Sequence, residues 1–75
     1  MALGGLDIGS TGCKVTVYDE EGNYLYRTYR DYPVSRKTGE HEVMAEDIWK
    51  GVCEVLADAG SHYPDLKAIG VSSFG

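Results

Sequence analysis

The residues best suited to chemistry in this sequence lie close together near its start. Asp7 ends a short apolar run, and Lys14 follows a few positions later. Between them is a turn of small and hydroxyl residues, Gly9, Ser10, Thr11 and Gly12. Such a turn directs backbone N–H groups and hydroxyls at one point with little side-chain bulk, which suits the oxyanion of a nucleotide phosphate. We therefore predict that this hairpin is one of two elements that together bind the phosphates of ATP.

Asp7 and Lys14 add a carboxylate and a cation to this turn. An acid at the end of an apolar strand costs stability unless it is paired or hydrated. Asp7 therefore either orients a water on a nucleotide-bound Mg²⁺, since hard cations prefer oxygen ligands, or caps the N–H groups of the turn. We expect the first, because the glycine and hydroxyl turn follows directly. Lys14 could offset charge during phosphoryl transfer, although taken alone it is typical of a solvated strand lysine.

The composition limits the partners of the chain. Its formal charge of −5 disfavours nucleic acids and anionic membranes, but it leaves ATP open, because phosphate sites use local N–H groups and a metal ion. No apolar run approaches the roughly 18–20 residues that span a bilayer. The N-terminus also lacks the pattern of a signal peptide, so we expect a cytoplasmic protein. The 75 residues make at most one small domain.

The cysteines and histidines predict neither a disulfide nor a metal held by protein side chains. Cys13 and Cys53 match no paired spacing, and we expect both to be reduced thiols in apolar surroundings. His41 and His62 have no ligand-type spacing to each other or to the cysteines. Trp49 and the tyrosines are expected in core and edge packing.

Three strands joined by short turns are predicted to open the chain. Residues 2–8 indicate a central strand, residues 13–19 a second strand and residues 24–32 a third. The polar turn at residues 20–23 is typical of a hairpin, and charge on both faces of residues 24–32 favours an edge position. Along the second strand, Cys13, Val15 and Val17 should face one way, and Lys14, Thr16 and Tyr18 the other.

A helix and a fourth strand are predicted to follow. After a loop at residues 34–43, apolar residues recur at helical spacing over residues 45–59, namely Ile48, Val52, Val55, Leu56 and Ala59. Met44 offers no N-cap acceptor, and Gly60 is the expected residue after the helix end. Residues 67–73 should pair parallel to the first strand, as usual after a helix crossover. The chain then stops in what looks like the start of a loop, so we expect truncation after Gly75.

Residues 6–22 together resemble the first phosphate motif of the actin-like ATPase superfamily, which covers sugar kinases, hexokinases, actin and heat-shock chaperone ATPases. Within it, the later segments are similar to the FGGY carbohydrate kinases. The matching segments are Tyr32-Pro33, Gly39-Glu40-His41-Glu42, Glu46-Asp47-Ile48-Trp49 and Ile69-Gly70-Val71-Ser72. The sequence departs from the pattern at Met44-Ala45, where the family often has Asp-Pro. It also departs at Ser73-Phe74-Gly75, which differs from the Gly-Gln-x-His-Gly of xylulose kinases and leaves the sugar open.

The resemblance implies a fold and an activity. The fold is α/β, with residues 1–75 forming the N-terminal part of one ribonuclease-H-like ATPase domain in the order β-β-β-α-β. The intact protein would transfer the γ-phosphoryl group of Mg·ATP to a hydroxyl of a sugar or polyol. Asp7 would organise the Mg²⁺ water shell, and Lys14 would steady the transferring group. The phosphate would be held by Gly9, Ser10, Thr11 and Gly12, and the sugar side of the cleft would include Phe74 and Gly75.

The resemblance also implies what lies outside this segment. The family's catalytic aspartate, second phosphate motif and adenosine pocket come further along such chains, so residues 1–75 alone are expected to be inactive. Two alternatives stay open. One is another actin-like ATPase, notably the activator ATPases of 2-hydroxyacyl-CoA dehydratases, whose first motif is very similar. The other is a non-catalytic piece that self-associates through exposed strand edges into a homo-oligomer.

Overall fold

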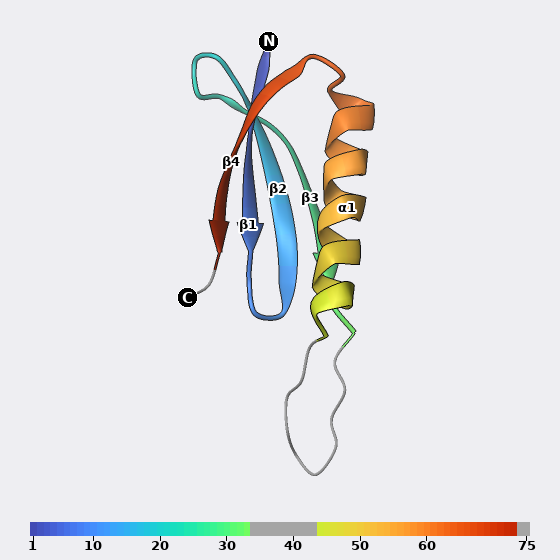
Figure 1. Ribbon diagram of the computed structural model, residues 1–75. Coiled ribbons are helices and arrows are strands. Elements are labelled where there is room, and N and C mark those ends of the chain that lie inside the picture. The colour runs from blue at the N-terminus through green and yellow to red at the C-terminus, as the bar shows by residue number, and fades with distance from the viewer. Residues whose placement is uncertain (34–43, 74–75) are drawn as a thin grey trace.

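The structure is a computed structural model that describes residues 1–33 and 44–73 (Figure 1). Its elements are β1 (Ala2–Ile8), β2 (Gly12–Asp19), β3 (Tyr24–Asp31), α1 (Ala45–His62) and β4 (Leu66–Ser73). The predicted order β-β-β-α-β is confirmed. The loop predicted at residues 34–43 and the proposed sugar-side residues, Phe74 and Gly75, lie outside the described residues.

The four strands form one sheet in the order β3-β2-β1-β4. β1 pairs antiparallel to β2 and parallel to β4, and β3 is an edge strand, so the predicted topology is confirmed. Strand β2 alternates as predicted, because Cys13, Val15 and Val17 are buried while the side chains between them are more exposed. This alternation places the residues of β2 that could do chemistry on the face of the sheet opposite to the core.

The core lies between the sheet and α1. Figure 1 shows α1 running along β2 and β3. Val15, Val17 and Val55 are fully buried there. The predicted helical stripe is confirmed, because Val52, Val55 and Ala59 are buried and Ile48 and Leu56 pack partly buried against them. Within the described residues, no helix combines the length and the apolar character needed to cross a membrane.

The end of α1 differs from the prediction. The helix continues to His62, so Gly60 lies inside it, and the Tyr63 N–H donates to the Ala59 carbonyl at 2.9 Å. A glycine inside a helix costs only about 1 kcal/mol, which tertiary contacts of the last turn offset. His62 supplies such a contact by stacking on Tyr26 of β3. At the other end, Met44 makes no side-chain cap, as predicted.

Two predicted burial positions on α1 are wrong. Trp49 was expected in packing but is 68% exposed, and the thiol of Cys53 is exposed as well. The two residues are one helical turn apart on the side that faces away from the sheet. Cys13 behaves as predicted, because burial raises the pKa of its thiol and keeps it neutral.

A polar network joins the last turns of α1 to β3. The Tyr26 hydroxyl donates to Asp58 Oδ2 at 3.0 Å, and His62 Nδ1 lies 3.3 Å from Asp58 Oδ1. Hydrogen bonds from Thr28 and Tyr26 to the charged carboxylate lower the pKa of Asp58. The folded state therefore favours the ionised form of this residue.

The variant Asp58→Asn is expected to be less stable than the parent protein near neutral pH. Because the pKa of Asp58 is lowered on folding, its contribution is complete above the ordinary value of 3.8 and is lost as the pH falls through the lowered value. Asp58→Asn should therefore show a lower urea midpoint at pH 7 and a shallower loss of stability on acidification. Glu20→Gln, which removes one charge from the exposed turn after β2, is the control. Identical pH profiles for Asp58→Asn and the parent would contradict this account.

Candidate functional site

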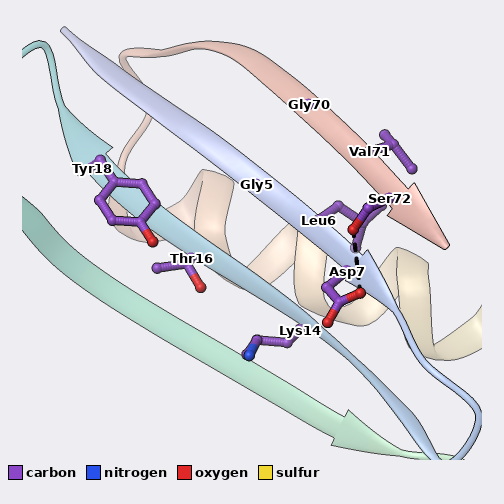
Figure 2. A pocket seen from close by; sticks show the side chains of 9 residues that line it. All are labelled: Gly5, Leu6, Asp7, Lys14, Thr16, Tyr18, Gly70, Val71 and Ser72. Carbon is purple, nitrogen blue, oxygen red and sulfur yellow. Dashed lines mark hydrogen bonds between the residues drawn. The ribbon is translucent and has the colours of Figure 1, made fainter. Parts of the chain in front are cut away.

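An open cavity of about 510 Å³ lies on the face of the sheet that α1 leaves bare (Figure 2). Strands β1, β2 and β4 each contribute three of its lining residues. These are Gly5, Leu6 and Asp7, then Lys14, Thr16 and Tyr18, and finally Gly70, Val71 and Ser72. Two of the predicted site residues, Asp7 and Lys14, are thus brought to one cavity.

The positions of Asp7 and Lys14 follow from the strand register. They are directly opposed across β1 and β2, so their side chains share one face of the sheet. Asp7 is exposed and Lys14 is half-buried. On its other side, Asp7 is opposed by Ser72 of β4, whose hydroxyl donates to Asp7 Oδ1 at 3.3 Å.

The two charges are neighbours but are not paired with each other. Within residues 1–33 and 44–73, no ion pair joins Asp7 to Lys14, and Figure 2 shows the Lys14 amine directed away from the Asp7 carboxylate. A carboxylate and an ammonium that lie side by side, with no ion pair between them in the described part of the chain, suit a ligand that carries both a cation and an anion. A metal ion bound to phosphate is such a ligand, because hard cations take oxygen ligands and an ammonium binds phosphate.

Asp7 would bind such a metal without help from a cluster of other metal-binding side chains. In the described part of the chain, no group of three or more histidine, cysteine, aspartate or glutamate side chains could hold a metal ion. One carboxylate is nevertheless enough for Mg²⁺, which keeps several waters and is held by one or two carboxylates together with substrate phosphates. The donor set therefore fits a magnesium ion that arrives with its nucleotide.

The glycine and hydroxyl turn lies beside the cavity and does not line it. The Gly9 N–H donates to the Gly12 carbonyl at 2.9 Å, and the Thr11 carbonyl accepts from the Tyr32 N–H at 3.0 Å. The N–H of Gly9 is therefore already used inside the turn. Ser10 and Thr11, at the tip, have exposed side chains. Of the four predicted phosphate ligands, these two have the freest access to a ligand.

The glycines of this turn are explained by space and not by backbone conformation. Among the described glycines, the one with a positive φ is Gly22, at 87°. A Cβ on Gly12 would collide with the Tyr29 hydroxyl and would lie 2.5 Å from the Arg30 carbonyl oxygen. Tyr29 and Arg30 of β3 thus leave no room for a side chain at Gly12.

Sequence reasoning missed several cavity residues. Thr16 and Tyr18 share a face with Lys14, and this alternation was visible in the sequence. Gly5 and Gly70 are opposed across β1 and β4, and a Cβ on either would have no heavy atom within 4 Å. Backbone therefore forms this part of the cavity floor. The pairing of β1 with β4 could not be placed residue by residue from the sequence.

Comparisons with known proteins find one matching family and several similar solved structures. The sequence profile of the FGGY family of carbohydrate kinases, N-terminal domain, matches residues 2–75. A gluconate kinase and a ligand-bound xylulose kinase, both from Lactobacillus acidophilus, superpose with TM-scores of 0.84 and 0.85 at 28% identity. A glycerol kinase with ADP from Plasmodium falciparum shares the fold, with a TM-score of 0.81 at 20% identity.

The matches cover nearly all of this chain but only a small part of each matched chain. Each superposition covers 96% of this chain, but only 15% of the two Lactobacillus chains and 16% of the glycerol kinase. The chain therefore spans about one-seventh of the length of the first solved structures that it matches. No curated protein sequence matches it.

The crowding at Gly12 predicts a large cost for a single methyl group. Gly12→Ala should destabilise the protein by about 1–3 kcal/mol, because the Arg30 carbonyl belongs to the backbone and cannot move aside as a side chain can. Gly60→Ala is the matched control, since its Cβ would meet no atom within 4 Å and alanine is favoured inside a helix. It should stabilise the protein by about 0.5–1 kcal/mol. Urea denaturation measures both, and equal effects of the two substitutions would contradict the assignment.

Proposed function

The chain belongs to the FGGY family of carbohydrate kinases, and from this membership we propose that the protein carrying it transfers the γ-phosphoryl group of ATP to a hydroxyl of a sugar or polyol. In this proposal, the hairpin of β1 and β2 is the first phosphate-binding element of the enzyme. The family resemblance inferred from the sequence is confirmed by the match over residues 2–75. This match favours a carbohydrate kinase over an activator-type ATPase.

The observation that carries the proposal is the Asp7 carboxylate beside the Lys14 amine, with no ion pair between the two among residues 1–33 and 44–73. Both line one cavity, from directly opposed positions on adjacent strands. Leaving two opposite charges apart forgoes a salt bridge, although such exposed bridges are worth only about 0–1 kcal/mol. The arrangement therefore costs the fold little stability, and it keeps both groups available to a magnesium–phosphate ligand.

Each residue has a distinct role in this proposal. Asp7 would hold the metal through its waters, since an ionised carboxylate can only accept hydrogen bonds. Lys14 places a positive charge near the phosphoryl group, where negative charge is redistributed during transfer. Ser10 and Thr11 offer hydroxyl and N–H donors to phosphate oxygens, while Gly9 and Gly12 shape the turn. When bound, Mg²⁺ supplies neutralisation of the phosphate charge.

The structural neighbours suggest which acceptors to try. The two at 28% identity are a gluconate kinase and a xylulose kinase, so a sugar acid and a ketose are the first candidates. We also propose that Phe74 and Gly75, which follow β4 directly, reach the sugar side. Because this chain spans 15% of those structures, the remaining groups of such an enzyme would come from chain beyond this segment.

The activity is tested on the intact protein with Mg·ATP and a panel of acceptors. The panel contains gluconate, xylulose and glycerol together with other pentoses, hexoses and polyols, and ADP release is measured with and without each acceptor. We expect release that depends on one acceptor or a small related set. ATP hydrolysis without dependence on any acceptor would contradict a carbohydrate kinase.

The role of Lys14 is tested in the same assay. Lys14→Ala should lower kcat by about 100-fold, the usual effect of removing one group that stabilises transition-state charge, with a smaller change in the KM of the acceptor. The control is Lys67→Ala, because Lys67 is an exposed lysine near the start of β4 and does not line the cavity. It should leave kcat unchanged. Equal kcat values for Lys14→Ala and the parent would refute the assignment.

A further inference from the structure

We propose that Ser72 is a positioning residue for Asp7, holding its carboxylate in the orientation in which it meets the metal–phosphate ligand. This inference rests on the proposed function and extends it to a strand that the hairpin does not contain. Ser72 belongs to the Ile69-Gly70-Val71-Ser72 segment, to which the proposed function gives no task.

The parallel pairing of β1 and β4 brings the two residues together. Asp7 and Ser72 are opposed across these strands although they are 65 positions apart in the sequence. The Ser72 hydroxyl donates to Asp7 Oδ1 at 3.3 Å, the contact drawn as a dashed line in Figure 2. Both side chains line the cavity, so this contact forms beside the space that the ligand would occupy.

Asp7 benefits from such a donor because little else fixes its carboxylate. The side chain is exposed, and the terminal torsion of an aspartate is broad, with no sharp staggered preference. In the described part of the chain, the hydroxyl of Ser72 provides the one side-chain hydrogen bond to Asp7. A donor on Oδ1 restricts this torsion and leaves Oδ2 to the waters of the metal.

The contact is long for a hydrogen bond between two oxygen atoms, so its expected contribution is modest. A separation of 3.3 Å exceeds the 2.5–3.0 Å usual for O–H···O bonds. Partners that hydrogen-bond the ligands of a metal typically contribute about 10–100-fold to metal affinity. A contact acting on a carboxylate that reaches the metal through water should contribute less.

The test is a double-mutant cycle on the intact protein, read out as binding of Mg·ADP by calorimetry. Ser72→Ala should weaken binding by about 3- to 10-fold. In the Asp7→Ala background the same substitution should change binding by less than about 2-fold, because a residue acting through Asp7 has no effect once the carboxylate is gone. Ser72→Thr keeps the hydroxyl and should restore affinity to within about 2-fold of the parent protein.

Ser73→Ala is the matched control. Ser73 is the next residue of β4, opposes Ile8, and points to the other face of the sheet. It should leave binding unchanged, and thermal unfolding of each variant checks that the fold is kept.

The outcomes separate the inference from the proposed function. Loss of affinity on Ser72→Ala that is equal in both backgrounds, or no loss at all, would overturn the inference while leaving Asp7 in its role. If Asp7→Ala itself binds Mg·ADP as tightly as the parent protein, the proposed role of Asp7 fails, and the inference fails with it. A loss of Mg·ADP affinity on Ser72→Ala that disappears in the Asp7→Ala background, together with near-parent affinity of Ser72→Thr, supports both the inference and the proposed role of Asp7.

Discussion

The register of β1 against its two neighbours is the constraint on which the site depends. Because β1 is paired on both sides, one residue, Asp7, has Lys14 on one flank and Ser72 on the other. Strand side chains alternate between faces, so a slip of one position would send Asp7 to the face covered by α1. The buried side chain of Leu6 opposes such a slip, since it would have to leave the core. Packing on the helix-covered face of the sheet thus determines which side chains lie on the other face.

The two sides of β1 are held by different means. The hairpin of β1 and β2 is backed by α1, which packs along β2 and β3 and buries Val15 and Val17. Strand β4 is joined to the sheet through β1, and its Val71 is 65% exposed even though it opposes the buried Leu6. Of the two flanking residues, Lys14 therefore lies on the strand that is packed against α1. The hydrogen bond from Ser72 to Asp7 comes from β4, the edge strand that α1 covers less. At such an edge, a side-chain contact that fixes the Asp7 carboxylate adds to the few other contacts that hold it.

Most of the fold could be predicted from the sequence, because its signals are local. Period-two alternation gave β2, period-3.6 spacing gave the buried side of α1, and charge on both faces placed β3 at an edge. The failures at Gly60 and Ser72 came from tertiary contacts that the sequence does not display, whereas Trp49 and Cys53 lie exposed on the side of α1 that faces away from the sheet. Gly60 looked like a helix end, but the contact of His62 with Tyr26 extends α1 past it. Asp7 and Lys14 were found through their spacing in the hairpin. Ser72 was seen only as part of a strand, since its opposition to Asp7 depends on a pairing between distant segments.

The central claim is that the turn end of the β1–β2 hairpin holds a magnesium-bound nucleotide phosphate. A crystal structure of the intact protein with Mg·ADP tests it most directly. The account predicts a magnesium ion whose coordinated water is hydrogen-bonded to the Asp7 carboxylate, with phosphate oxygens against Ser10 and Thr11 and the Lys14 amine turned toward the position of the transferred group. Nucleotide phosphates bound away from this hairpin, with neither Asp7 nor Lys14 facing them, would contradict it.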